Sequence, residues 1–267
     1  MKITGLYSYP LKSGKAISME STDVLSTGFV NDRTLVVIDE NNKVITGREI
    51  PELTSITVQI TDNILTISKE GWGKISFALP FAEHHKVVSF KLFRNKVSGL
   101  LCDATASGWL SDVLGTKCRL VFIKDNYRPI DPNRGGMAND LVGYADASPI
   151  HLITEASLQA LNAILVKKVT ALHFRPNLVV HGGEAYAEDH WKIVTINDCE
   201  FEVHHHCKRC IFTTIDPVTA ARDENMEPLT TLAKFRKERN EKLTFGIYLV
   251  PRKTGNIQLG NKVVKVI

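Results

Sequence analysis

The sequence has no long apolar run and nothing that resembles a targeting segment. No stretch of its 267 residues approaches the ~18 consecutive apolar residues needed to cross a bilayer. The chain starts directly with alternating apolar residues, without the apolar core and small-residue cleavage site of a signal peptide. We therefore expect a soluble, cytoplasmic protein that does not associate with membranes.

Cysteine is scarce, and its number is odd. The five cysteines are Cys102, Cys118, Cys199, Cys207 and Cys210. This count argues against a disulfide scaffold and indicates a reducing compartment. Three of the cysteines are scattered, and we expect them at buried apolar positions or strand ends.

A large charge of one sign is also missing. Lys and Arg number 33 against 29 Asp and Glu, which gives a net charge of +4 and excludes a histone-like nucleic-acid binder. The balance permits an anionic small-molecule ligand. With 43% hydrophobic and 23% charged residues, global disorder is excluded as well.

The hydrophobic pattern of the first half predicts short strands. Expected strands are 3–9, 33–39, 43–47, 53–60, 64–69, 74–79, 86–92 and 97–102. Residues 104–114 follow a helical period, with Leu110, Val113 and Leu114 on one face. Residues 125–142 are rich in Pro, Gly, Asn and charge, which predicts a long loop, and such loops are usually functional or mobile.

The second half continues the alternation of strands with a few helices. Expected strands are 150–153, 177–180, 191–196, 199–205, 245–250, 257–259 and 263–266. Helices are expected after Thr154, with Leu158, Leu161 and Leu165 on one face, and over 228–237. The pattern predicts a mainly β (α+β) protein of two halves, which we place at 1–120 and 121–267.

The densest cluster of reactive side chains is the run His204-His205-His206-Cys207-Lys208-Arg209-Cys210. The Cys-x-x-Cys spacing brings two thiols within reach of one centre, and the neighbouring cations favour the thiolate. A zinc site would need four ligands, yet an extended strand points His204 and His206 away from His205. Thioredoxin-type exchange would need a helix start, whereas 211–214 is expected to continue extended. A thiolate ligand to a soft metal and a pair of inert cysteines remain as further hypotheses.

Seven short segments occur together and in order along the chain. They are Tyr9-Pro10-Leu11-Lys12-Ser13, Asn31-Asp32-Arg33, Thr46-Gly47-Arg48, Tyr144-Ala145-Asp146-Ala147-Ser148-Pro149, Phe174-Arg175-Pro176-Asn177, Cys207-Lys208-Arg209-Cys210-Ile211 and Phe245-Gly246. In this order the chain resembles the MOSC-domain family with an N-terminal MOSC β-barrel. This family includes the mitochondrial amidoxime-reducing components and bacterial hydroxylaminopurine-resistance proteins. The resemblance implies an N-terminal MOSC β-barrel domain interlocked with a C-terminal MOSC domain.

The resemblance also implies a molybdenum cofactor in its molybdopterin form, with Cys210 as the metal ligand. The cofactor-binding residues that it implies are Lys12, Ser13, Arg33, Ser148, Arg175, Asn177, Lys208 and Arg209. The implied reaction removes oxygen from N-hydroxylated compounds such as amidoximes, hydroxylamines and N-hydroxylated purine bases. Asp146, in the segment that lies beside the metal in the family, is a hypothetical proton relay and the second expected catalytic residue.

Each of these residues also has an ordinary interpretation when it is taken alone. Lys12 with Ser13, or Asp146 with Ser148, can form a turn. Arg33 can pair weakly with its neighbour Asp32 on the surface. Arg175 precedes a proline, which favours an extended backbone. Only their occurrence together, in the order of the family, favours a shared site.

The chain departs from the family pattern at two positions. Lys208 stands where relatives often carry Ser, and Ile247 stands where many have Gln after Phe245-Gly246. The Cys-x₄-Cys-x₂-Cys spacing of a plant-type ferredoxin domain is absent. We therefore expect electrons from a separate donor protein of the ferredoxin, flavodoxin or flavoreductase type.

Two alternatives of other classes remain open from the sequence. One is a non-catalytic carrier of molybdenum cofactor or sulfur, in which Cys210 holds the cargo. The other is a zinc-binding interaction domain built on His204, His206, Cys207 and Cys210. No stable binding of nucleic acid is expected.

Overall fold

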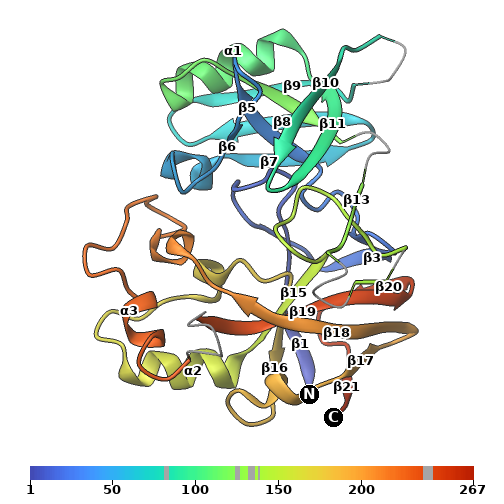
Figure 1. The fold of residues 1–267 in the computed structure, drawn as a ribbon, viewed down its shortest axis with the longest axis vertical. Coiled ribbons are helices and arrows are strands. Elements are labelled where there is room, and N and C mark those ends of the chain that lie inside the picture. Colours follow the sequence, from blue (N-terminus) through green and yellow to red (C-terminus); the bar gives the residue numbers. More distant parts are fainter. Residues whose placement is uncertain (81–83, 124–126, 132–135, 138, 237–242) are drawn as a thin grey trace.

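The computed structural model describes residues 1–80, 84–123, 127–131, 136–137, 139–236 and 243–267. Two lobes lie one above the other in Figure 1, each built mainly of strands. The predicted mainly β fold is confirmed. None of the helices formed by these residues is long and apolar enough to cross a membrane.

The upper lobe contains a five-stranded and a three-stranded antiparallel sheet. The first has the order β10 (Val87–Leu92), β11 (Asn95–Leu101), β12 (Cys118–Phe122), β5 (Leu35–Asp39) and β6 (Val44–Ile45). The second consists of β7 (Thr57–Thr61), β8 (Ile64–Lys69) and β9 (Gly73–Ala78). Helix α1 (Ala104–Leu114) is capped by the Asp103 carboxylate, which accepts from the Thr105 N–H, and it buries Leu110 and Leu114 in the core.

The lower lobe is organised around an eight-stranded sheet. Its order is β2 (Ile17–Ser18), β1 (Lys2–Ser8), β16 (Leu178–His181), β15 (Ile150–Thr154), β19 (Thr244–Lys253), β18 (Cys199–Lys208), β17 (Ile193–Ile196) and β21 (Val263–Val266). A three-stranded sheet of β20 (Gly255–Gln258), β3 (Ser21–Leu25) and β4 (Gly28–Phe29) accompanies it. The smaller elements are β13 (Arg128–Pro129), β14 (Leu141–Val142), α2 (Glu155–Ile164) and α3 (Leu229–Leu232).

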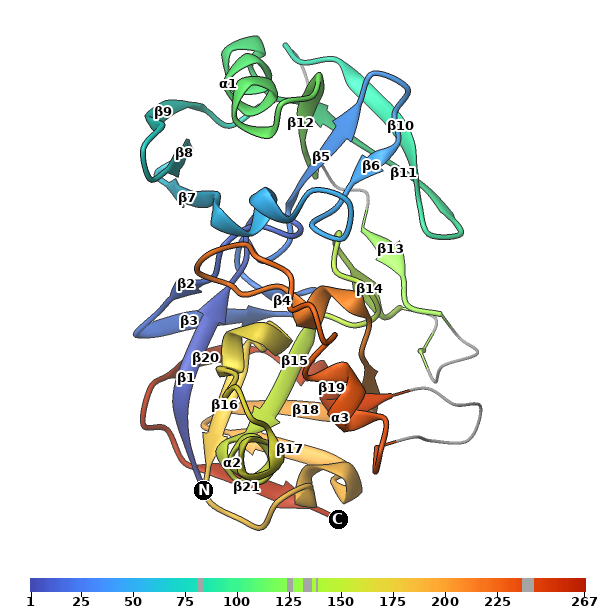
Figure 2. The same ribbon diagram turned by 90° about the vertical axis from the view of Figure 1, so that its left-hand side faces the viewer.

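The chain crosses between the lobes rather than filling them one after the other. Strand β1 pairs antiparallel with β16, and β3 pairs with β20, so the first strands of the chain complete the sheets of the last third. Figure 2 shows β1, β3 and β20 together in the lower lobe, while the chain between β5 and β12 forms the upper one. The segments that cross the boundary carry Lys12, Ser13 and Arg33, which line the pocket described below.

Several sequence expectations were wrong in detail. Residues 53–55 belong to a 3₁₀ helix, Pro51–Ser55, because the fixed φ of Pro51 starts a turn there rather than a strand. The helix expected over 228–237 is a single turn, α3, with the β-branched Thr230 and Thr231 at its centre, while residue 237 lies outside the described residues. Residues 211–214 form a 3₁₀ turn instead of continuing extended.

Most other elements occur where they were predicted, with boundaries displaced by a few residues. The loop expected over 125–142 is only partly described, since 125–126, 132–135 and 138 lie outside the described residues. Its described part includes the short pair β13 and β14, which join at Arg128–Val142 and Pro129–Leu141. Leu165 caps the C-terminus of α2 rather than continuing it.

Candidate functional site

A pocket at the junction of the two lobes gathers residues from both ends of the chain. It is lined by Lys12, Ser13, Arg33, Ala145, Asp146, Ser148, His151, Phe174, Arg175, Asn177, Lys208, Arg209, Cys210, Phe212 and Tyr248. All ten residues that the resemblance implied are in this set. The structure therefore brings them to one place, while their chemical roles stay predictions.

Turns with left-handed backbone aim several of these side chains. Ser13, Arg33 and Arg175 have φ values of 67°, 48° and 53°. Residues other than glycine adopt this left-handed backbone conformation only at a cost in free energy. Arg175 caps the end of the 3₁₀ turn Ala171–Phe174, and two residues separate it from the start of β16. Such conformations persist where surrounding contacts hold them, and here hydrogen bonds supply that support.

Two motif glycines permit close packing at the pocket. A Cβ atom on Gly47 would lie 2.6 Å from the Phe212 ring, so a larger residue there would displace this ring, which lines the pocket. Gly246 has a φ of 74°, and a Cβ there would lie 2.5 Å from the Leu152 carbonyl oxygen. The segments Thr46-Gly47-Arg48 and Phe245-Gly246 thus have a packing explanation, without any contact to a ligand.

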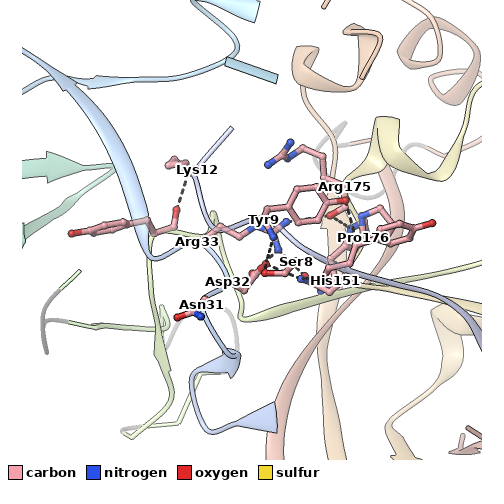
Figure 3. A network of polar contacts seen from close by, with 12 residues as sticks. Ser8, Tyr9, Lys12, Asn31, Asp32, Arg33, His151, Arg175 and Pro176 are labelled. Atoms are coloured by element: carbon pink, nitrogen blue, oxygen red, sulfur yellow. Dashed lines mark hydrogen bonds and ion pairs between the residues drawn. The ribbon is translucent and has the colours of Figure 1, made fainter. Parts of the chain in front are cut away.

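One wall of the pocket consists of charges that are balanced inside the protein. Arg33 Nη1 lies 2.6 Å from Asp32 Oδ2 and donates to Asn177 Oδ1 at 2.9 Å, while Nη2 donates to the Arg175 carbonyl. The side chains of Arg33 and Asp32 are only 12% and 3% exposed, so this pair is buried rather than the weak surface pair of the ordinary interpretation. Figure 3 shows Asp32 close to Ser8 and Tyr9, and it accepts from the Tyr9 N–H at 2.8 Å.

The amide of Asn177 completes this wall. Its Nδ2 donates to the Tyr7 carbonyl and to Asp32 at 3.1 Å each, and its Oδ1 accepts from Arg33 and from the His151 N–H. These four bonds use the donors and lone pairs of a side-chain amide. Asn177 therefore positions Arg33 and Asp32, and a direct contact from its amide to a ligand stays a prediction.

Lys12 and Asp146 form the other balanced pair. The buried Lys12 ammonium contacts the Asp146 carboxylate and donates to the Tyr144 carbonyl at 3.0 Å. Burial lowers the pKa of Lys12, and the Asp146 charge opposes that effect. Enclosure raises the pKa of Asp146, but the Lys12 and Arg48 charges outweigh it and hold this pKa at about 2. Asp146 is thus an ionised partner of Lys12.

Arg175, by contrast, has a guanidinium without a carboxylate partner. Within the described part of the chain, no carboxylate lies within ion-pair distance of it, and its Nη1 donates to the Gly14 carbonyl at 2.6 Å. The guanidinium carbons of Arg175 and Arg33 each lie 4.2 Å from the centre of the buried Tyr9 ring. Burial, together with the like charge of Arg33, lowers the pKa of Arg175 to about 10. This wall therefore carries positive charge that favours an anion.

The Cys-x-x-Cys segment places its two thiols in different environments. Cys207 is buried, and Arg209 Nη1 lies 2.6 Å from its sulfur; burial raises the pKa of this thiol although the guanidinium opposes it. Arg209 also donates to the Phe174 carbonyl at 2.8 Å, and its buried Nε has no hydrogen-bond partner among the described residues. Cys210 is exposed and lines the pocket, whereas Cys207 does not. Lys208, the last residue of β18, is exposed beside it.

Sequence reasoning missed two titratable residues of the pocket, the buried His151 and the half-buried Tyr248. The ring nitrogens of His151 on β15 lie 3.3 Å and 3.5 Å from the Phe245 and Arg175 carbonyl oxygens, and burial holds the pKa of His151 well below its usual range. Tyr248 on β19 packs 5.5 Å from that ring, and burial raises the pKa of its hydroxyl. A histidine inside an otherwise apolar strand, Ile150–Thr154, was the available signal.

The histidine run does not alternate as a regular strand would. The pairing of β18 with β19 is irregular between Val203 and His205, and the rings of His204 and His205 lie 4.5 Å apart. The prediction that they point in opposite directions was therefore wrong. His204 Nδ1 lies 2.6 Å from the Ser148 hydroxyl, which ties the run to the pocket wall.

Neither the zinc nor the thioredoxin-type hypothesis finds support. Among the residues that the structure describes, no group of three or more His, Cys, Asp and Glu side chains is placed to hold a metal ion. The turn that follows Cys210 spans only Ile211–Thr214, too short for the helix start that thioredoxin-type exchange uses.

Comparisons with known proteins cover nearly the whole chain. The model of the MOSC N-terminal beta barrel domain matches residues 1–117, and that of the MOSC domain matches residues 139–264. Mitochondrial amidoxime reducing component 2 of Rattus norvegicus is 34% identical over 282 residues, covering 99% of this chain and 83% of that protein. Mitochondrial amidoxime-reducing component 1 of Danio rerio is 33% identical, covering 99% and 84%, and that of Homo sapiens is 31% identical, covering 98% and 82%.

Proposed function

The chain belongs to the MOSC-domain family with an N-terminal MOSC beta barrel, and from this premise we propose that it is a molybdenum-dependent oxidoreductase. In this proposal the protein binds a molybdenum cofactor in the pocket and reduces N-hydroxylated compounds such as amidoximes, hydroxylamines and N-hydroxylated purine bases. The names of its relatives describe reduction of amidoximes by those proteins.

The observation that carries the proposal is the charge imbalance beside an exposed thiol. Arg175 and Arg209 line the pocket with Cys210, and neither guanidinium has a carboxylate partner in the described part of the chain. A pterin cofactor with a phosphate and dithiolene sulfurs fits this donor set, since guanidinium groups match phosphate oxygens and a thiolate suits a soft metal. The buried Nε of Arg209, which lacks a partner there, is a further donor at the same wall.

The proposal gives the residues of the chain separate roles. Cys210 ligates the metal, Arg175, Arg209 and Lys208 bind the anionic part of the cofactor, and Ser13 and Ser148 supply hydroxyls at its edge. When bound, the cofactor supplies the two-electron chemistry that takes oxygen from nitrogen. Overall, R–NHOH with two electrons and two protons gives R–NH₂ and water.

A proton-relay role for Asp146 stays a prediction that its environment disfavours. A general acid works best when its pKa lies near the operating pH, whereas Asp146 is held at about 2 by Lys12. The same pair supports a different role, in which the Asp146 carboxylate keeps the buried Lys12 ammonium charged and in place at the pocket.

Metal analysis tests this function directly. Protein made in a host with intact molybdopterin synthesis is expected to contain molybdenum near one atom per chain. Cys210→Ser should remove it, whereas the matched variant Cys207→Ser should keep most of it, because Cys207 is buried against Arg209. Zinc in place of molybdenum would overturn the proposal.

A second measurement separates the enzyme from a cofactor or sulfur carrier. The loaded protein should turn over benzamidoxime when reduced methyl viologen supplies the electrons. Retention of molybdenum without any turnover would favour the carrier.

A further inference from the structure

The hairpin of strands β10 and β11, in the upper lobe, carries positive charges and no negative ones. It carries Lys91, Arg94 and Lys96, with Lys86 directly before it, and residues 84–101 contain neither Asp nor Glu. Lys91, Arg94 and Lys96 are exposed, so their charges face solvent. An element of this kind attracts anionic partners over about a Debye length.

The tip of this hairpin reaches the wall of the pocket. Phe93, with a left-handed φ of 55°, is 43% exposed. Its ring centre lies 5.1 Å from the Lys12 ammonium and 5.8 Å from the Arg128 guanidinium. Lys12 lines the pocket, so the exposed ring marks the surface directly above one of its walls.

An open groove of about 310 Å³ lies beside the tip, and the buried Lys12 is one of the residues that line it. Its cations include Lys43, Arg48 and Lys91, with the backbones of Lys43 and Lys91 paired side by side. Glu49, the one carboxylate among the described residues that line it, is already engaged by Lys43 at 2.7 Å. The charges of Lys43 and Glu49 offset each other, so Arg48 and Lys91 supply the positive charge that the groove adds to that of the hairpin.

We propose that the β10–β11 hairpin and this groove form the docking surface for an acidic, one-electron carrier protein. The proposal rests on the proposed function, because the reduction of R–NHOH to R–NH₂ consumes two electrons and two protons. A one-electron carrier must therefore dock, release its electron and leave twice in each turnover.

A surface of long, solvated cations around an exposed aromatic side chain suits this repeated exchange. Rim charges mainly accelerate association, and electron-transfer encounters have small interfaces that separate readily. Phe93 supplies an apolar contact at the centre, where aromatic side chains contribute most to binding.

The test uses a reduced plant-type [2Fe–2S] ferredoxin, which is acidic, as the donor to the loaded protein. The double variant Lys91→Glu/Arg94→Glu should raise the KM for ferredoxin about tenfold or more, and it should flatten the dependence of turnover on salt. Turnover with reduced methyl viologen should stay within about twofold, since neither residue lines the pocket.

The β8–β9 hairpin provides a matched control. Lys69→Glu/Lys74→Glu makes the same change of net charge in the same lobe, and Figure 2 shows β8 and β9 on the opposite side of that lobe from β10 and β11. This control should leave the KM for ferredoxin unchanged. If both double variants raised the KM for ferredoxin equally, the effect would depend on net charge and not on the hairpin, and the proposal would be overturned.

Direct binding keeps this test separate from the proposed function. The affinity for oxidised ferredoxin can be measured by calorimetry at about 20 mM and about 200 mM salt, where the Debye length is about 20 Å and about 7 Å. It should fall in the Lys91→Glu/Arg94→Glu variant even if the protein turns over no substrate. Unchanged affinity would overturn the proposed docking surface.

A raised KM for the N-hydroxylated substrate, measured with methyl viologen as donor, would also overturn it, because the groove would then bind substrate.

Discussion

The two walls of the pocket differ in how their positive charges are balanced. On one wall, Arg33 pairs with Asp32, and Lys12 pairs with Asp146. On the other, Arg175 and Arg209 bond to carbonyl oxygens and to a thiol, without a carboxylate partner in the described ranges of the chain. The first wall is complete by itself, and the second favours a ligand that brings negative charge.

This difference separates scaffold from binding surface among side chains of the same type. Burying a guanidinium without a counterion costs free energy, which a protein tolerates where a ligand later supplies the opposite charge. Variants of the balanced wall should therefore lose stability, while variants of the unbalanced wall should lose ligand affinity.

The largest effect is expected for Arg33→Gln. Removal of Arg33 leaves the buried Asp32 carboxylate charged but without its counterion, and it takes a hydrogen bond from Asn177. Together these losses should lower the free energy of unfolding by about 3–5 kcal/mol. Equilibrium unfolding in urea measures this change. Arg48→Gln, at an exposed position, is the control and should change stability by less than about 0.5 kcal/mol. A similar small change in Arg33→Gln would remove the distinction between the walls.

The next effect concerns ligand binding rather than stability. Arg175→Gln should weaken retention of the cofactor by about 10–100-fold, because a hydrogen bond to a charged group contributes about 1.5–3 kcal/mol. Its unfolding free energy should change by less than about 1 kcal/mol, since no ion pair with a described carboxylate is broken. Molybdenum and pterin retained per chain after dialysis, compared with Arg175→Lys, provide the measurement. Stability lost in place of cofactor would assign Arg175 to the scaffold.

The smallest effect is expected for Asp146→Asn, and it depends on pH. The folded pKa of about 2 lies below the ordinary value near 3.9, so the ionised carboxylate stabilises the fold above pH ~4 and loses this contribution as the pH falls toward 2. The Asp146 side chain is 55% exposed, and solvent screening limits the contribution to about 1 kcal/mol. Unfolding curves of the two proteins should differ at pH 7 and converge near pH 2. A constant difference across this range would show that the pair is not the cause.

The sequence predicted most strands because period-two alternation is a local signal. It failed where local and tertiary preferences compete. The buried Leu53 looked like a strand residue, but Pro51 starts a 3₁₀ turn that buries it equally well. The irregularity at His204 has no sequence signal, because it arises from the register between β18 and β19.

The candidate site depended on order along the chain rather than on local pattern. Spacing alone could not place Lys12 beside Asp146, which lies 134 positions later. The resemblance supplied that connection, and the structure brings the pair together. Neither spacing nor the resemblance separated Asn177, whose amide is fully engaged inside the protein, from residues that face a ligand. That distinction needed individual hydrogen bonds.

The pairing of β3 with β20 has a consequence for the biosynthesis of this protein. Residues 21–25 can pair with 255–258 only after a ribosome has added the latter, roughly 10–50 s later at about 5–20 residues per second. Strand β1 also remains without its partner β16 for much of that time, so neither sheet of the lower lobe is completed early during synthesis. A ligand of the pocket must therefore enter late, after Tyr248, the last residue that lines the pocket, has been synthesised, so it meets a nearly complete fold rather than an isolated N-terminal half.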